Sequence, residues 1–324
     1  MEQIELKMLQ ALPLDVKILK TKQRIREWYE YYNGKVYVSF SGGKDSTVLL
    51  DIVRSIYPKI QAVFADTGLE FPEIRSFVKQ TENVVWLKPK LGFKQVIEKY
   101  GYPVIGKETA HGVKYAQKKD NSKSCLYYLK RFDGTLLKPD GTKSIYNAEK
   151  YKFLLDAPYK ISDECCNVMK KKPIHKYERE TGYVPFIGTM AGESRLRKTK
   201  YLRVGCNSFK QNNPQSTPIG FWTEKDIWDY IKLYNTPYSK IYDMGYERTG
   251  CMFCMFGAHL EKGKNRFQTM QSTHPKQYEY CMKNIEQGGL GLAKVLDYIN
   301  VSYRDDLDDK KTAEGVNYQQ YRIT

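Results

Sequence analysis

Hydrophobic and polar positions follow the period of a helix in some stretches of the chain and of a strand in others. In residues 15–33, Ile18, Ile25 and Trp28 recur at seven- and three-residue steps, which predicts an amphipathic helix. Short β-rich runs predict strands at 36–40, 60–65, 84–87 and 184–188, with helix-compatible segments at 47–53 and 72–81. This alternation predicts an α/β fold with a parallel sheet whose faces are covered.

The remaining segments predict less regular structure. Residues 118–151 are polar, and their Asp-Gly turn signals at 133–134 and 140–141 indicate an insertion or flap. Residues 223–231 predict a helix with Thr223 as its N-cap. We predict one α/β domain over residues 1–260 and a helical, basic extension over residues 261–324.

Composition narrows the class of protein. Apolar residues make up 41% of the 324 residues, and 27 Tyr and 13 Phe suit a globular core. The longest apolar runs are strand-sized, far short of the ~20 residues that span a bilayer, so we expect no membrane partner. The N-terminal residues lack the apolar stretch of a secretory signal, and seven cysteines without such a signal point to a reducing, cytoplasmic location.

The charge balance points to anionic partners. The chain carries 53 Lys and Arg against 37 Asp and Glu, a formal net charge of +16. Such a surplus raises the local concentration of nucleotides or nucleic acid, although a well-solvated basic surface remains the alternative. Basic clusters at 170–172 and 195–200 could likewise be solvated or neutralise phosphates.

A glycine-rich turn follows the first predicted strand. Two glycines flanked by serines let several backbone N–H groups point at one anion at the start of a helix, with a lysine adding charge. The residues of this candidate phosphate loop are Ser41, Gly42, Gly43, Lys44, Asp45 and Ser46. The pattern differs from G-x-x-x-x-G-K-[ST], which disfavours a P-loop NTPase. The alternative is an ordinary Gly-Gly turn.

A second polar turn ends the strand at 60–65. It contains Asp66, Thr67 and Gly68. In parallel sheets, ligands bind beyond the carboxyl ends of the strands, so we expect this turn to lie beside the phosphate loop.

Four of the cysteines fall into two pairs. Cys165 and Cys166 are adjacent, Cys251 and Cys254 form a C-x-x-C, and 84 residues separate the pairs. Four thiolates suit a tetrahedral metal or an iron–sulfur cluster. Adjacent cysteines fit zinc less easily, which favours a cluster, but zinc and four structural thiols stay open. The other three cysteines have no partner at metal-ligand spacing.

Several motifs resemble those of one enzyme family. Ser-Gly-Gly-Lys-Asp-Ser at 41–46 is the signature loop of the PP-loop adenine nucleotide α-hydrolase superfamily, and residues 65–73 resemble a segment of the phosphoadenosine phosphosulfate (PAPS) reductase family. The resemblance continues through residues 188–195, 218–227 and 237–251. It implies a doubly wound, mostly parallel sheet with helices on both faces and an adenine nucleotide over the loop.

The resemblance also assigns site residues. It adds Asp66, Thr67, Gly68, Gly188 and Glu193 to the nucleotide-binding residues of the phosphate loop. It implies catalytic roles for Lys44, Asp45 and Arg195, with Mg²⁺ at the phosphates.

The spacing of the cysteine pairs is similar to that in adenylylsulfate (APS) reductases and in the sulfur-transfer proteins of DNA phosphorothioation. By that similarity, Cys165, Cys166, Cys251 and Cys254 are the expected ligands of a [4Fe–4S] cluster, which would hold or deliver sulfur.

Two departures from the reductases favour ATP as the ligand. Those enzymes end in Glu-Cys-Gly-[Ile/Leu]-His, whose cysteine attacks sulfur, whereas this sequence ends Gln-Gln-Tyr-Arg-Ile-Thr. Met190 also stands where many reductases have an arginine.

Three functions therefore remain open. The first is a PP-loop enzyme that cleaves ATP between its α and β phosphates and adenylylates a nucleic acid, tRNA or DNA, for sulfur transfer from a donor such as a cysteine desulfurase. The second is an APS or PAPS reductase that uses an unconventional thiol such as Cys206 or Cys281. The third is a nucleotide- or nucleic-acid-binding protein without turnover. The oligomeric state stays open, with a homodimer among the options.

Overall fold

The computed structural model describes residues 2–305, which form parts of two compact units. The first unit comprises residues 1–90 and 169–250, and the second comprises residues 91–168 and 251–324. The chain therefore leaves the first unit, builds part of the second, returns, and then completes the second. These units do not follow the division at residue 260, which stays a prediction about domain organisation.

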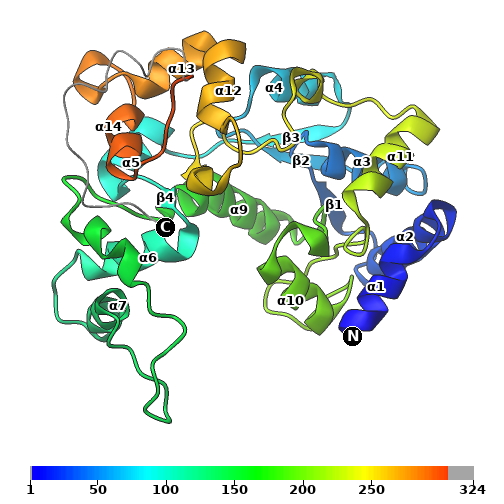
Figure 1. Ribbon diagram of the computed structural model, residues 1–324. Coiled ribbons are helices and arrows are strands. Elements are labelled where there is room, and N and C mark those ends of the chain that lie inside the picture. Colours follow the sequence, from blue (N-terminus) through cyan, green and yellow to red (C-terminus); the bar gives the residue numbers. More distant parts are fainter. Residues whose placement is uncertain (1, 306–324) are drawn as a thin grey trace. The chain divides into compact units, whose positions relative to one another are not determined.

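The first unit is built on a four-stranded parallel sheet. Its strands are β1 (Val36–Ser39), β2 (Ala62–Ala65), β3 (Val84–Leu87) and β5 (Val184–Ile187), in the order β3-β2-β1-β5, and β1, β2 and β3 are seen side by side in Figure 1. All four strands lie where the sequence predicts them. The chain moves outward from β1 to β3 and then crosses to the other side of β1. The topological switch point therefore lies between β1 and β5.

Side chains alternate between the two faces of this sheet. Tyr37 and Val63 share one face, where they pack with Tyr177 of α9 (Lys172–Thr181). Phe64 points to the other face and is also fully buried. Burial on both faces confirms the predicted doubly wound α/β class, because only helices on both sides can cover such a sheet.

The helices of the first unit agree with the periodic segments of the sequence. Their bounds are Gln3–Ala11 (α1), Leu14–Tyr31 (α2), Lys44–Arg54 (α3), Pro72–Gln80 (α4), Lys172–Thr181 (α9), Arg195–Val204 (α10) and Glu224–Tyr234 (α11), with 3₁₀ turns at Ala191–Glu193 and Lys240–Met244. Helix α3 contacts β1, and α2 and α11 contact α3. The predicted N-cap of α11 is confirmed, since Thr223 Oγ1 accepts a hydrogen bond from the backbone N–H of Asp226.

The second unit is mainly helical. Its helices are Phe93–Tyr100 (α5), Lys107–Ala116 (α6), Lys123–Asp133 (α7), Glu164–Cys166 (α8), Arg266–Thr273 (α12), Pro275–Met282 (α13) and Leu292–Tyr298 (α14), with 3₁₀ turns at Glu149–Asp156, Ala258–Leu260 and Ile285–Gln287. A π-helical turn, Asn167–Lys171, follows α8. Helices α12 to α14 confirm the helical region expected after residue 262, and the last part of that region, residues 306–324, lies outside the described residues.

A short parallel pair, β4 (Val104–Ile105) with β6 (Met255–Phe256), joins distant parts of the second unit. The sequence does not predict this pair. Its second strand follows the C-x-x-C directly, so β6 fixes the position of that motif beside β4.

Residues 118–151 contain more structure than the predicted flap. Both turn signals are confirmed, because Gly134 and Gly141 have left-handed φ angles of +75° and +79°. Gly134 ends α7, and Ser122 caps its start by accepting a hydrogen bond from Cys125 N.

Within residues 2–305, no helix is both long enough and apolar enough to cross a membrane.

Candidate functional site

The candidate phosphate loop begins at the carboxyl end of β1 and leads into α3. Gly42 has a φ of +73°, and a Cβ there would lie 2.7 Å from Val78 Cγ2 and 2.9 Å from Ile74 Cγ2. Only glycine fits this tight turn. Gly43 then stands at the N-cap of α3, so the helix begins directly at the loop.

The two serines brace the loop. Ser41 Oγ and Ser46 Oγ lie 3.0 Å apart, and Ser46 Oγ donates to Gly43 O at 2.9 Å. The hydroxyls of the two serines thus stabilise the conformation in which the loop would bind an anion.

Lys44 is the buried cation of the site, with a relative exposure of 4%. Its Nζ lies 3.1 Å from Glu224 Oε1 and donates to the carbonyl oxygen of Glu247 at 3.2 Å. The ring centroids of Tyr242 and Trp228 lie 5.3 and 5.9 Å from Nζ. This environment stabilises the ammonium group beside the loop by charge, hydrogen bonding and cation–π attraction.

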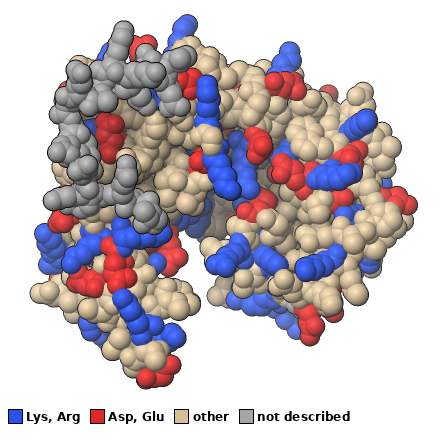
Figure 2. Space-filling view, in the orientation of Figure 1, with Lys and Arg blue, Asp and Glu red and all other residues tan. Residues whose placement is uncertain are grey.

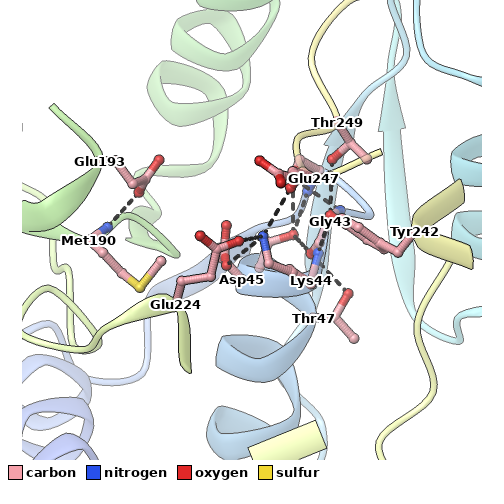
Figure 3. A network of polar contacts seen from close by, with 12 residues as sticks. Gly43, Lys44, Asp45, Thr47, Met190, Glu193, Glu224, Tyr242, Glu247 and Thr249 are labelled. Carbon is pink, nitrogen blue, oxygen red and sulfur yellow. Dashed lines mark hydrogen bonds and ion pairs between the residues drawn. The ribbon is translucent and has the colours of Figure 1, made fainter. Parts of the chain in front are cut away.

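Tyr242 ties the loop to a later segment of the chain. Its hydroxyl accepts a hydrogen bond from Lys44 N at 2.8 Å and lies 3.2 Å from Thr249 Oγ1 (Figure 3). A Cβ on Gly43 would lie 2.8 Å from that Thr249 oxygen. Residues 242–249 therefore pack directly on the loop.

Asp45 is the acidic member of the loop. Burial raises the pKa of its carboxyl, while the positive charges of Lys44, Arg197 and Arg248 oppose that shift. Its Oδ1 is buried, lies 3.8 Å from Lys44 Nζ, and accepts no hydrogen bond from any described residue. A carboxylate oxygen without a hydrogen bond, beside a candidate phosphate site, suits a Mg²⁺ ligand.

The second polar turn is rigid. Asp66 accepts hydrogen bonds from Arg75 Nη2 at 2.9 Å and from Gly68 N at 3.3 Å. Thr67 donates its hydroxyl and its backbone N–H to the Glu70 carboxylate. This turn follows β2, the neighbour of β1, so it lies at the same edge of the sheet as the phosphate loop, as the sequence predicts.

Gly188 lies against the phosphate loop. A Cβ on this residue would be 2.9 Å from Ser46 Cα and 3.0 Å from Asp45 O. The structure thus brings the end of β5 to the loop at the switch point.

The two remaining predicted residues lie beyond Gly188 in the chain. Glu193 accepts a hydrogen bond from Met190 N at 2.6 Å and pairs with Arg197. Arg195, the predicted catalytic arginine, is exposed at the start of α10. The arginine whose charge acts on Asp45 is Arg197, two residues later. The catalytic role of Arg195 therefore stays a prediction.

Sequence reasoning does not assign Glu224, Tyr242 and Thr249 to the site. The motif segments that contain them point to the region, but no local pattern shows that they contact the loop. Arg197 could have been found from its i,i+4 spacing to Glu193.

The four paired cysteines all belong to the second unit, and none of them forms a disulfide. Cys165 Sγ and Cys166 Sγ lie 4.0 Å apart. The hydrogen bond to Cys166 and burial hold the pKa of the Cys165 thiol far above its usual value, and negative charge on Cys254 and Cys251 adds to the shift. Burial and Cys251 raise the pKa of Cys254 to about 11. The four thiols are therefore close enough to interact electrostatically.

A single metal ion and an iron–sulfur cluster place different geometric demands on the four thiols. Nowhere in residues 2–305 do three or more His, Cys, Asp or Glu side chains stand in a group that could hold a metal ion. Thiolates on one zinc ion, with bonds of about 2.3 Å, must converge closely. A cluster binds each thiolate to a different iron atom, so its ligands lie further apart than the 4.0 Å between Cys165 Sγ and Cys166 Sγ. By donor type alone, four thiols suit either centre, and the cluster ligands Cys165, Cys166, Cys251 and Cys254 stay a prediction.

The fold and the loop together define an α/β protein with a candidate anion site at the switch point of its sheet. Residues 35–129 and 137–256, well over half of the chain, match the family model of the phosphoadenosine phosphosulfate reductase domain. The chain belongs to this family, which is enzymatic.

The chain is also similar to individual proteins. The chain is 26% identical to the uncharacterized protein MJ0066 of Methanocaldococcus jannaschii over 75% of its own length but only 41% of that protein, so it spans less than half of this relative. It is 27% identical to an adenosine 5'-phosphosulfate reductase of Staphylococcus haemolyticus, over 72% of this chain and 76% of the relative. A crystal structure of PAPS reductase from Candida auris, a phosphate complex, matches with a TM-score of 0.41 and 16% identity over 78% of this chain and 96% of that one.

Proposed function

We propose that this protein binds ATP at the loop of Ser41–Ser46, cleaves it between the α and β phosphates, and adenylylates a nucleic acid for sulfur transfer. The observation that carries the nucleotide site is the buried Lys44, held beside the N-terminus of α3 at the carboxyl end of β1. A fixed cation and a row of helix N–H groups are what a polyphosphate requires.

The proposed reaction has two steps. A carbonyl oxygen of the acceptor attacks the α-phosphorus, the bond from that phosphorus to the bridging oxygen breaks, and pyrophosphate leaves with the electron pair. Hydrosulfide, supplied by a sulfur donor, then adds to the activated carbon and displaces AMP, releasing one proton. Lys44 and the α3 amides stabilise the charge that develops on the phosphates, and Asp45 Oδ1 would hold Mg²⁺.

The raised pKa values of two cysteine thiols favour ATP over a sulfonucleotide as the ligand. A reductase needs a thiolate that attacks sulfur, and the thiolate is the reactive form of cysteine. Burial raises the pKa of Cys206, the cysteine of the first unit. Burial also raises the pKa of Cys281 to about 12. Both candidates for an unconventional nucleophile are therefore held protonated at neutral pH.

A second candidate function is an APS or PAPS reductase. It is favoured by the relatives that carry the name adenosine 5'-phosphosulfate reductase, three-quarters of whose length this chain covers. The four-cysteine set is compatible with either function, so it does not separate the two.

The test uses protein purified without air. The protein is incubated with Mg²⁺ and α-labelled ATP, alone, with tRNA and with DNA, and AMP and pyrophosphate are measured. We expect both products, stimulated by one nucleic acid and abolished in Lys44→Ala. Lys59→Ala, which removes an exposed lysine before β2, is the matched control and should keep full activity.

Other outcomes would reject the proposal. Sulfite released from APS or PAPS with a thiol reductant, and no AMP from ATP, would establish the reductase instead. Nucleotide binding without any product would indicate a binding protein.

A further inference from the structure

Helix α10 has an unusual charge distribution. Half of its ten residues are basic and none is acidic: Arg195, Arg197, Lys198, Lys200 and Arg203. Two of them, Arg195 and Arg197, stand in the first turn, where the helix dipole favours acidic side chains. Arg195 and Arg197 therefore oppose the helix dipole, which suggests that these charges serve another purpose.

These charges are largely uncompensated. Arg197 pairs with Glu193, but in the described part of the chain no acidic side chain forms an ion pair with the other four cations. Burial and the neighbouring charge of Arg203 lower the pKa of Lys200, so adjacent cations repel one another. Figure 2 shows Lys and Arg gathered on the surface over α10.

The basic surface of α10 is continuous with the candidate nucleotide site. Arg197 lies near enough to Asp45 of the phosphate loop for its charge to oppose the rise that burial causes in the pKa of that carboxyl. Arg197 and Lys200 also line a small cavity of about 40 Å³, together with Thr189 and Met190, which follow β5. A polyanion bound along α10 would therefore extend directly to the phosphate loop.

We propose that α10 binds the phosphodiester backbone of the nucleic acid acceptor and guides it to the nucleotide at Ser41–Ser46. The identity of the acceptor rests on the proposed function. A ten-residue helix extends about 15 Å, the length of roughly four phosphates of one strand, so its five cations exceed what a single nucleotide needs. Because contacts to phosphates carry no sequence information, binding through this backbone should be independent of sequence.

The test reverses two charges that lie outside the proposed catalytic machinery. Lys198→Glu with Arg203→Glu is compared with Lys59→Glu and Lys79→Glu, which change the charge equally but lie near β2 and β3, at the opposite side of the sheet from β5. Fluorescence anisotropy measures binding of a labelled single-stranded DNA, the matching duplex and a tRNA at several salt concentrations. A thermal melt followed by circular dichroism checks that each variant folds.

We expect the α10 variant to bind the preferred probe at least about tenfold more weakly. Its log–log salt slope should fall by about 1.4 for a single strand, since two phosphate contacts are lost at about 0.7 each. The control should behave as the unmodified protein. The three probes decide whether RNA or DNA supplies the backbone.

Two results would overturn the inference: unchanged binding by the α10 variant, or an equal loss in the control. Loss of ATP binding with unchanged nucleic-acid binding would assign α10 to the nucleotide and also refute it. A protein that binds nucleic acid through α10 but never cleaves ATP would refute the proposed function and leave this interface in place.

Discussion

Gly188 and Ser46 lie so close together that a Cβ on Gly188 would stand 2.9 Å from the Ser46 Cα. Real side chains essentially never make such a contact with backbone, so one of the two segments would have to move. The contact joins the end of β5 to the first turn of α3, on either side of the switch point. The shape of the phosphate loop thus depends on a strand that follows it by well over a hundred residues.

Gly188→Ala should therefore weaken nucleotide binding. The added methyl group displaces the loop, and overpacking of this kind costs about 1–3 kcal/mol of stability. Isothermal titration with ATP and Mg²⁺ measures the affinity. Gly192→Ala is the control, because a Cβ there meets nothing within 4 Å. Equal affinities in the two variants would contradict the proposed role of this contact.

A second prediction concerns the ion pair between Lys17 and Asp226. These residues join α2 to α11 at 2.7 Å, and Lys17 is only 2% exposed. Asp226→Ala should destabilise the protein by about 3–5 kcal/mol, because it leaves a buried ammonium uncompensated. Asp229→Ala, which breaks the exposed pair with Lys225, should cost at most about 0.5 kcal/mol. Urea denaturation compares them, and similar losses would show that burial of the pair does not matter.

A third prediction follows from the raised pKa of Asp45. Burial favours the neutral carboxyl, so the folded protein holds this proton to a higher pH than the unfolded chain does. The contribution of Asp45 to stability therefore decreases as pH rises from the ordinary value of about 3.9 through the raised pKa. Asp45→Asn should lack this decrease. Unfolding free energies of both proteins across the acidic range test it, and parallel curves would contradict it.

The strands and the helices next to them could be predicted because their signals are local. The β-rich run of β1, the spacing of Ile18 and Ile25 in α2, and the cap at Thr223 each lie within one element. The loop was predicted from its own glycines, serines and lysine, and Gly188 from the resemblance to a known family. In each case the information lies within a few neighbouring residues.

Other features depend on the tertiary fold. Lys44 and Tyr242 are 198 residues apart, and no pattern along the chain predicts their contact. Strands β4 and β6 have two residues each, too few to show a period. The choice between Arg195 and Arg197 depends on which side of α10 faces Asp45, and that is set by how α10 packs.

A fourth prediction tests whether Cys206 or Cys281, which lie outside the four paired cysteines, is the nucleophile of a reductase. Because burial holds Cys206 and Cys281 protonated, replacing both by serine should leave AMP formation from ATP within about twofold of the unmodified rate. The same double variant should also leave any sulfite release unchanged. A large loss of sulfite release would make one of these thiols the nucleophile of a reductase.

The last prediction concerns the four paired cysteines. Burial and, after it, the charge of Cys251 raise the pKa of Cys254, so several buried thiolates together are unfavourable unless a cation compensates them. Protein purified without air should therefore contain iron and sulfide, and Cys254→Ser should lose most of both. Cys125→Ser is the control, since Cys125 is buried elsewhere in the same unit and its thiol donates to Ala116 O. Metal analysis and visible absorption give the readout. One zinc per chain in place of iron would mean a mononuclear site, and neither metal would make the four thiols structural.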